Sequence, residues 1–305
     1  MNTRQLQYVI TLAEEKSFSE AANRLLISQP SLSQYIQKLE KELGMELFER
    51  TLPLKLTKAG ETYVQTAKKI ISMEEEMLKQ LEDIQDGVRG KIVIGAGFLN
   101  SIVLLPNIVS LFQKRFPDVE VSVYEDMEPN LKAKADAGEI DLFFSTSEIK
   151  DPAYESIELF QEEYLLATPI GMSYGRSGHP FGEFNTIDIS RARDLPFIML
   201  SSNTYISETV ESIYHARGIE PKRIATCTSA TAAYSMTKAG VGATLIPFST
   251  YKTDYSLYVN YYRIADCNQR RTVHIYYNKN RYISKVMREF IMECEMFFEE
   301  NYIEK

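Results

Sequence analysis

Apolar and polar positions alternate with the period of an α-helix through the first 45 residues. This spacing predicts a first helix over residues 3–15 and a second helix that has Ser19 as its N-cap. The residues expected to face inward from these two helices are Leu6, Val9, Ile10, Ala13, Ala21, Ala22, Leu25 and Leu26. A third helix is predicted from its N-cap Ser28 to Gly44, with Pro30 in the first turn, where the missing N–H costs nothing.

The third predicted helix has an apolar face and a polar face. At 100° per residue, one narrow arc holds Leu32, Ile36, Leu39 and Leu43. The opposite arc and its flanks hold Pro30, Ser31, Ser33, Gln34, Gln37, Lys38 and Lys41. A short helix, a tight corner and a helix with a polar outer face are typical of a helix-turn-helix, which inserts its second helix into the DNA major groove.

A hairpin and a long helix follow this module. Residues 47–50 predict a short strand, and residues 51–56 predict a wing with Pro53 at its tip. The helix expected over about 57–86 would be roughly 45 Å long at 1.5 Å per residue, which is too long to be buried against one small domain. We therefore expect it to form a dimeric coiled coil through its apolar stripe. Gly87 and Gly90 mark a hinge after it.

Beyond Gly90, short apolar strands alternate with helices. Strands are predicted at 91–95, 119–124, 141–145, 164–167, 197–200, 223–227, 242–247 and 272–277. Helices are predicted at 102–116, 131–137, 206–217, 230–238 and 283–298. This alternation favours a parallel α/β sheet, and the restart of the pattern near Tyr164 favours two lobes of similar size. Open sheets of this class bind ligands beyond the carboxyl ends of their strands, so we expect a ligand cleft between the lobes.

Composition narrows the class of protein. The 305 residues are 44% hydrophobic and 25% charged, which is ordinary for a globular protein of two to three domains. The sequence has no signal-peptide pattern and no long apolar run, so we expect a cytoplasmic protein without membrane contact. Three cysteines far apart in sequence suit a reducing compartment and form no metal motif with the three histidines, so no cofactor is expected.

The charge is distributed unevenly along the chain. The net charge is −8, yet residues 1–60 carry eight basic and seven acidic side chains, so the acidic excess lies in the C-terminal part. A balance of +1 is small for a module that binds phosphates. We expect the affinity for DNA to depend on several copies of the module binding together.

The sequence resembles the family of LysR-type transcriptional regulators. The matching segments of the first 60 residues are Leu6–Ile10, Ser17–Ala22, Leu25, Ser28–Ser33, Ile36, Leu39–Glu40, Leu43–Gly44, Leu47–Arg50 and Leu56–Gly60. Looser matches follow at Ile94–Gly95, Leu104–Pro106, Phe116–Pro117, Gly138–Asp141, Ala239–Gly242 and Ile246–Pro247. The resemblance therefore covers nearly the whole chain and is most specific in its first fifth.

This resemblance implies a fold and a function. The implied fold is a winged helix-turn-helix, a linker helix that dimerises, and a two-lobed α/β effector domain similar to periplasmic solute-binding proteins. The implied domains are 1–58 for DNA binding, 59–90 for the linker and hinge, and 91–305 for effector binding, with lobe one at 91–161 and 267–305 and lobe two at 162–266. The implied partners are double-stranded promoter operator DNA, a small-molecule effector in the cleft, further copies of the chain in a homodimer through residues 59–86 and a homotetramer, and RNA polymerase.

The expected DNA contacts come from the polar face of the third helix and from the wing. They are Gln29, Pro30, Ser31, Ser33 and Gln34 for bases, and Lys38, Arg50 and Lys55 for phosphates. The alternative is that this face is merely solvated. Two positions depart from the family: Gln34 stands where arginine is frequent, and the tip of the wing lacks arginine, so the target sequence cannot be copied from relatives.

The expected effector contacts are hydroxyl and amide groups that follow the predicted strands. They are Asn100, Ser101, Ser145, Thr146, Ser201, Ser202, Asn203 and Thr228. Such residues also cap helices, so ordinary N-capping is the alternative. Glu128 is a further candidate, which would disfavour an anion or prefer an amine, and Cys227 is more typical of a buried structural cysteine than of a redox sensor.

Two other classes of protein compete with a regulator. An enzyme-like α/β domain fused to a DNA-binding module would carry a nucleophile, metal or nucleotide motif, and none occurs; Gly95–Gly97 lacks the third glycine of a dinucleotide loop. A solute-binding protein of a transporter would need a signal peptide and would not need the first 86 residues. A regulator that is not an enzyme is the prediction.

Overall fold

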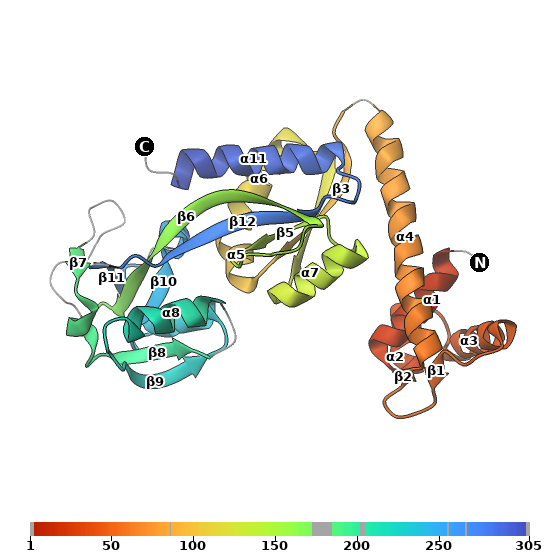
Figure 1. Cartoon of the computed structure of the whole chain (residues 1–305), viewed down its shortest axis with the longest axis horizontal. Helices are drawn as coiled ribbons and strands as arrows, with labels where there is room; N and C mark the ends of the chain where they lie inside the picture. The colour runs from red at the N-terminus through yellow and green to blue at the C-terminus, as the bar shows by residue number, and fades with distance from the viewer. Residues whose placement is uncertain are drawn as a thin grey trace. The chain divides into compact units, whose positions relative to one another are not determined.

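The computed structural model describes residues 3–85, 87–172, 185–201, 205–254, 256–265 and 267–302 (Figure 1). It divides into two units. The first consists of Met1–Asp86 with Asp136–Glu139, and the second consists of Gly87–Ala135 with Ile140–Lys305.

The first unit contains four helices and a two-stranded hairpin in its described part. These elements are α1 (Thr3–Glu15), α2 (Phe18–Arg24), α3 (Gln29–Leu43), β1 (Phe48–Glu49), β2 (Lys55–Leu56) and α4 (Lys58–Ile84). The two strands pair antiparallel, with Phe48 opposite Leu56. The apolar faces of α1, α2, α3 and the hairpin meet in one core, formed by Val9, Leu12, Ala21, Ala22, Leu32, Ile36, Leu47, Phe48 and Leu54. A second cluster of Leu6, Ile10 and Ala67 joins α1 to α4.

Local capping sets the ends of the helices. Ser28 caps α3 and accepts a hydrogen bond from the backbone N–H of Ser31, and Gly44 ends it in the left-handed conformation, as predicted. The prediction for α2 was wrong by two residues, because Ser17 is the N-cap. Leu26 does not face inward as expected: its side chain is 92% exposed, since it occupies a left-handed position in the turn before α3.

Gly60 ends the segment Leu56–Gly60, which matches the LysR-type family, and close packing requires a glycine there. A Cβ atom at this position would lie 2.0 Å from the carbonyl oxygen of Leu47, so any side chain would push α4 away from the strand that precedes the wing. The glycine therefore allows the start of α4 to pack closely on the hairpin.

The second unit begins with lobe one. Its elements are β3 (Gly90–Ala96), α5 (Phe98–Val103), α6 (Leu105–Arg115), β4 (Val119–Glu125), α7 (Glu128–Ala137), β5 (Leu142–Ser145) and the first part of β6 (Tyr154–Pro169). The chain returns to this lobe with β12 (Arg270–Asn278) and α11 (Lys285–Tyr302). Helix α11 packs on the long strands, where the rings of Phe160 and Phe298 stack with centroids 4.7 Å apart (Figure 1).

Lobe two contains the end of β6 and the elements between it and β12. They are β7 (Asn185–Ile187), a 3₁₀ turn (Ile189–Ala192), β8 (Pro196–Leu200), α8 (Tyr205–His215), β9 (Lys222–Cys227), α9 (Ala230–Lys238), β10 (Thr244–Pro247), α10 (Phe248–Thr253) and β11 (Val259–Ile264). Strands β8 and β9 pair parallel to each other, and Phe197 forms a bridge with Ala243.

One sheet runs through both lobes. Its described strands follow the order β4-β3-β5-β12-β6-β11-β7, and β10 pairs with β6 as well. The first part of β6 pairs with β12, and its last part, from Tyr164 onward, pairs with β10 and β11. The strand β6 therefore belongs to both lobes and passes from one to the other without a loop.

Three features of this unit differ from the sequence predictions. Strands β3, β4 and β5 are parallel as expected, but β12 is antiparallel to β5 and β6, so the sheet is mixed. Strand β6 is far longer than the predicted 164–167. The predicted helix 102–116 is two helices, α5 and α6, and Pro106 lies in the first turn of the second because it has no N–H to continue the first.

Candidate DNA-binding face and effector pocket

The outer face of α3 is open to solvent. Of the predicted DNA contacts, Ser33 is half-buried, and the others are exposed: Gln29, Pro30, Ser31, Gln34, Lys38, Arg50 and Lys55. The apolar face opposite them is anchored by Leu32 and Ile36, which are fully buried. The helix therefore presents the polar side chains outward from a rigid core, which is the geometry needed to read the edges of bases.

Arg50 is held by contacts inside the module. Its Nη2 atom lies 3.0 Å from Oε2 of Glu40, and its guanidinium lies 5.7 Å from the ring centroid of Phe18. The other oxygen of the buried Glu40 carboxylate accepts hydrogen bonds from the backbone N–H groups of Leu47 and Phe48, at 2.9 and 3.2 Å. This network fixes the corner between α3 and β1, so Arg50 has a structural role in addition to the predicted phosphate contact.

The other predicted DNA contacts are less constrained. Lys38 makes a loose exposed ion pair with Glu42 at 3.9 Å, which is a weak interaction in water. The hydroxyl of Ser31 hydrogen-bonds to that of Ser28 at 2.7 Å. Lys55 lies on the exposed side of β2. Side chains with such loose contacts can be reoriented toward phosphates or bases at little cost.

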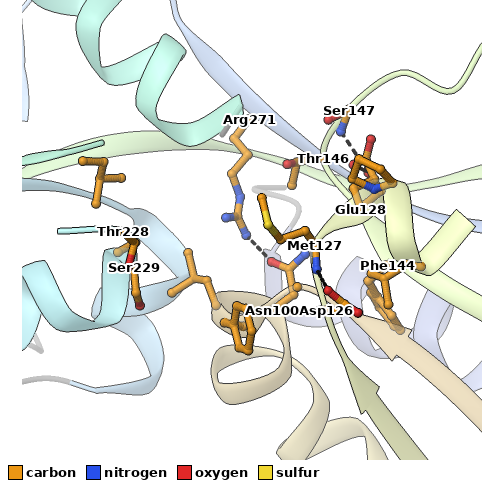
Figure 2. Close-up of a pocket in the computed structure, with 18 residues that line it drawn as sticks. Asn100, Asp126, Met127, Glu128, Phe144, Thr146, Ser147, Thr228, Ser229 and Arg271 are labelled. Carbon is orange, nitrogen blue, oxygen red and sulfur yellow. Dashed lines mark hydrogen bonds between the residues drawn. The ribbon is translucent and has the colours of Figure 1, made fainter. Parts of the chain in front are cut away.

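The second unit contains a pocket of about 330 Å³ between its two lobes (Figure 2). Lobe one contributes the start of α5, the start of α7 and the end of β5; lobe two contributes the end of β8 and the start of α9; and β12 contributes Arg271. The lining residues are Gly97, Phe98, Leu99, Asn100, Asp126, Met127, Glu128, Pro129, Leu131, Phe144, Ser145, Thr146, Ser147, Leu200, Thr228, Ser229, Ala230 and Arg271. This volume is sufficient for a small organic molecule.

Arg271, which lines this pocket, forms a buried ion pair with Glu162. The side chains of Arg271 and Glu162 are each 1% exposed, and Nε of the arginine is 2.8 Å from Oε1 of the glutamate. Arg271 also donates from Nη2 to Oδ1 of Asn100 at 2.8 Å (Figure 2). Glu162 in turn accepts from the backbone N–H and the hydroxyl of Ser249, at 2.6 and 3.1 Å. The chain of contacts thus leads from α5 in lobe one, through β12 and β6, to α10 in lobe two.

Two acidic side chains, Asp126 and Glu128, line the pocket near the start of α7. The Asp126 carboxylate accepts hydrogen bonds from the side-chain amide of Asn130 and the backbone N–H of Met127, at 2.8 and 2.7 Å, and these bonds lower the pKa of the carboxyl. Glu128 hydrogen-bonds to the hydroxyl of Ser145. Asp126 is therefore engaged by hydrogen bonds just before α7, whereas Glu128 lines the pocket without a basic partner among the described residues.

The predicted effector contacts are only partly gathered in this pocket. Asn100, Ser145, Thr146 and Thr228 line it. The other four residues do not belong to its described lining. The hydroxyl of Ser101 donates to the carbonyl of Phe98 and the carboxylate of Glu125. Ser201 is half-buried and its N–H donates to the carbonyl of Cys227, and Ser202 and Asn203 lie outside the described residues. Asn100 and Ser101 are buried within α5, and not in a loop before a helix as predicted.

Sequence reasoning missed Arg271. Its position at the start of β12 gave no signal, because its partners Asn100 and Glu162 are more than one hundred residues away along the chain.

The described residues contain no group of three or more histidine, cysteine or acidic side chains that could hold a metal ion. Cys227 is buried at the end of β9, with its sulfur 3.7 Å from that of Met236, and it forms no disulfide. Its surroundings are those of a packed structural thiol.

Comparisons with known proteins match both units. The family described as LysR substrate binding domain matches residues 85–297, and the bacterial regulatory helix-turn-helix protein, lysR family, matches residues 3–61. The chain belongs to the LysR family of transcriptional regulators. The predicted family is thereby confirmed, and so is the predicted fold class of a winged helix-turn-helix followed by a two-lobed α/β domain.

Individual LysR-type proteins resemble the chain over most of its length. It is 31% identical to the HTH-type transcriptional regulator BenM of Acinetobacter baylyi over 263 residues, which cover 82% of this chain and 81% of BenM. It is 28% identical to the HTH-type transcriptional regulator YcgK of Bacillus subtilis, covering 95% of this chain and 93% of YcgK. Among solved structures, CbnR superposes with a TM-score of 0.72 at 23% identity, covering 97% of this chain and 99% of CbnR, which shows the shared fold.

This LysR-type protein is therefore a DNA-binding transcriptional regulator with an effector-binding domain, and its relatives are regulators and not enzymes. Within the part of the chain that the structure describes, none of the helices has the length and apolar character needed to cross a membrane.

Proposed function

We propose that this regulator binds operator DNA through the exposed face of α3 and the wing, and that a small molecule in the pocket between the lobes changes how it does so. The observation that carries the proposal is the pocket itself, because its lining comes from both lobes, with Arg271 on β12 among its residues. A ligand that contacts both lobes stabilises one arrangement of the lobes over others, and such differential binding is what an effector requires.

The DNA contacts proposed are those predicted from the sequence, with Gln34 at the centre. Glutamine can bond bidentately to adenine, and the neighbouring serines can donate or accept. The exposure of these side chains supports the assignment. A protein of the same fold, CbnR, has been solved in complex with its target DNA, with a TM-score of 0.71 to this chain.

Self-association is proposed through α4. Five apolar residues, Ile70, Met73, Met77, Leu81 and Ile84, fall within an arc of about 80° on this helix and are at least 36% exposed. A matching helix of a second copy would cover this stripe. A dimer, or a tetramer built from two dimers, would bind DNA through several modules at once. This would compensate for the weak attraction to phosphates of one module with a net charge of only +1. The regulator would act in the cytoplasm on promoter DNA, and contact with RNA polymerase stays a prediction.

A salt-titrated footprint on the DNA that flanks the regulator's own gene tests the proposal. We expect protection over several helical turns, weakened by Gln34→Ala and unchanged by Gln65→Ala, which removes an exposed glutamine from α4. Protection that is insensitive to Gln34→Ala would move the base contacts elsewhere. Absence of specific protection by the folded protein at low salt would contradict operator binding at this site.

A further inference from the structure

The charges that line the effector pocket are unbalanced. Its described lining includes three ionisable side chains, Asp126, Glu128 and Arg271. Two carboxylates thus face a single guanidinium, and the question is which of these charges are available to a ligand.

The positive charge of Arg271 is already neutralised. Glu162 lies 2.8 Å from its Nε in an ion pair that lacks hydrogen-bond geometry, both side chains are almost completely buried, and Asn100 takes a hydrogen bond from Nη2. The guanidinium and the Glu162 carboxylate together carry no net charge, so an anion in the pocket meets a neutral pair and not a free cation. The pocket therefore offers an anionic ligand little attraction.

The two carboxylates differ in their availability. Asp126 is occupied by the backbone N–H of Met127 and the side chain of Asn130. Glu128 hydrogen-bonds to the hydroxyl of Ser145 and makes no ion pair in the described part of the chain, because Lys132, one turn further along α7, pairs with Asp151 at 2.8 Å. One carboxylate thus remains open to the cavity.

The rest of the lining is largely apolar. Carbon-rich side chains from both lobes line it together with the acidic group: Phe98, Leu99, Met127, Leu131, Phe144 and Leu200. Figure 2 shows Glu128 and Thr146 on one side of the pocket and Thr228 and Ser229 on the other, with Arg271 directed at Asn100.

We propose that the effector is a small amphipathic amine, whose protonated amino group is held by Glu128 while its apolar body packs against the side chains of both lobes. This inference deepens the proposed function and rests on the pocket being the effector site. An ammonium group beside an open carboxylate gains a charge-assisted hydrogen bond, whereas a carboxylate in the same place meets a like charge.

The test uses the full-length protein and a panel of small molecules with aryl, branched and linear carbon skeletons, each as amine, alcohol and carboxylate. Binding is measured by the rise in melting temperature and by calorimetry. We expect amines to bind and the matching carboxylates not to bind. Glu128→Gln should weaken amine binding about tenfold or more, since it removes a hydrogen bond to a charged group. The matched control Glu155→Gln, an exposed glutamate on β6 outside the pocket, should change nothing.

Three results would overturn the proposal: preferential binding of carboxylates, amine affinity that Glu128→Gln leaves unchanged, or no binding by any amine of the panel. Circular dichroism of both variants checks that they fold, and glutamine can still accept the Ser145 hydroxyl. Footprints of the ligand-free proteins separate the two proposals. If amines bind in a way that depends on Glu128 but no DNA is protected, only the proposal of operator binding is refuted. If the footprints are intact but no amine binds, only the proposal of an amine effector is refuted.

Discussion

Glu40 holds together the corner that aims α3 and the wing. Its carboxylate accepts the N–H groups of Leu47 and Phe48 and pairs with Arg50. A glutamate at the end of a DNA-binding helix would ordinarily repel phosphate. Here the charge is buried and compensated, so it contributes structure and leaves the outer face of α3 unaffected.

Glu40→Ala should therefore destabilise this corner by about 2–4 kcal/mol, because two buried N–H groups and one arginine lose their acceptor. Hydrogen exchange of residues 44–57 in the full chain measures the local opening free energy. Glu42→Ala, on the same helix but exposed, is the control and should change it by less than about 0.5 kcal/mol. Equal effects of the two substitutions would show that the Glu40 network is not required.

Asp126 makes the start of α7 sensitive to acid. Its pKa is lowered from the ordinary value of 3.8, chiefly by the hydrogen bond from Asn130 and then by that from Met127. The folded state thus prefers the ionised form, so the stabilisation is present above that ordinary value and is lost as the pH falls through the lowered value. We expect Asp126→Asn to be less stable than the wild type at pH 7 and the difference to shrink as the pH falls below 3.8. A difference independent of pH, measured by urea unfolding, would contradict this.

At the scale of elements, α4 uses two faces for two purposes. One face packs on α1 through Ala67, and the other carries the exposed stripe that includes Met77 and Leu81. A helix of 27 residues with so much exposed apolar surface is stable in water only if a partner covers it.

Leu81→Glu should weaken self-association by more than tenfold, because it places a charge where an apolar side chain is expected to be buried between two helices. Sedimentation equilibrium of the full chain measures this. Gln65→Glu introduces the same charge on a different exposed face of α4 and should leave the association unchanged. If Leu81→Glu self-associates as the wild type does, the stripe is not the dimer contact.

Elements with local end signals were predictable, and those defined by distant partners were not. Ser28 and Gly44 gave both ends of α3, and the bounds of α9 match the predicted 230–238, because capping depends on a few neighbouring residues. Strand β6 was seen only at its apolar end, since residues 154–163 alternate with charged positions and become a strand by pairing with β12. The same reason hid Arg271, whose role depends on Asn100 and Glu162.

In the second unit as a whole, the pair of Arg271 on β12 and Glu162 on β6 connects the two lobes. Arg271 contacts Asn100 of lobe one, and Glu162 contacts Ser249 of lobe two. Glu162→Gln should cost about 3–5 kcal/mol, because it leaves a buried guanidinium without a counter-charge. The double variant Arg271→Met with Glu162→Met should recover much of this loss, since two apolar groups leave no buried charge. The apparent stability of the three proteins in urea gives the comparison. A double variant as unstable as the single one would mean that packing, and not charge, dominates at this position.

The strand order has a consequence for synthesis. Strand β12 lies between β5 and β6 in the sheet, yet it is made after all of lobe two, as residues 270–278. A growing chain can form the β3-β4-β5 ladder early, but β5 keeps an open edge and β6 lacks its neighbour until residues 270–278 leave the ribosome. Open strand edges are sites of aggregation. Synthesis of this domain therefore begins with lobe one, but lobe one is among the last parts to be completed. A premature stop before residue 270 would release a chain in which lobe two is joined to an unfinished sheet.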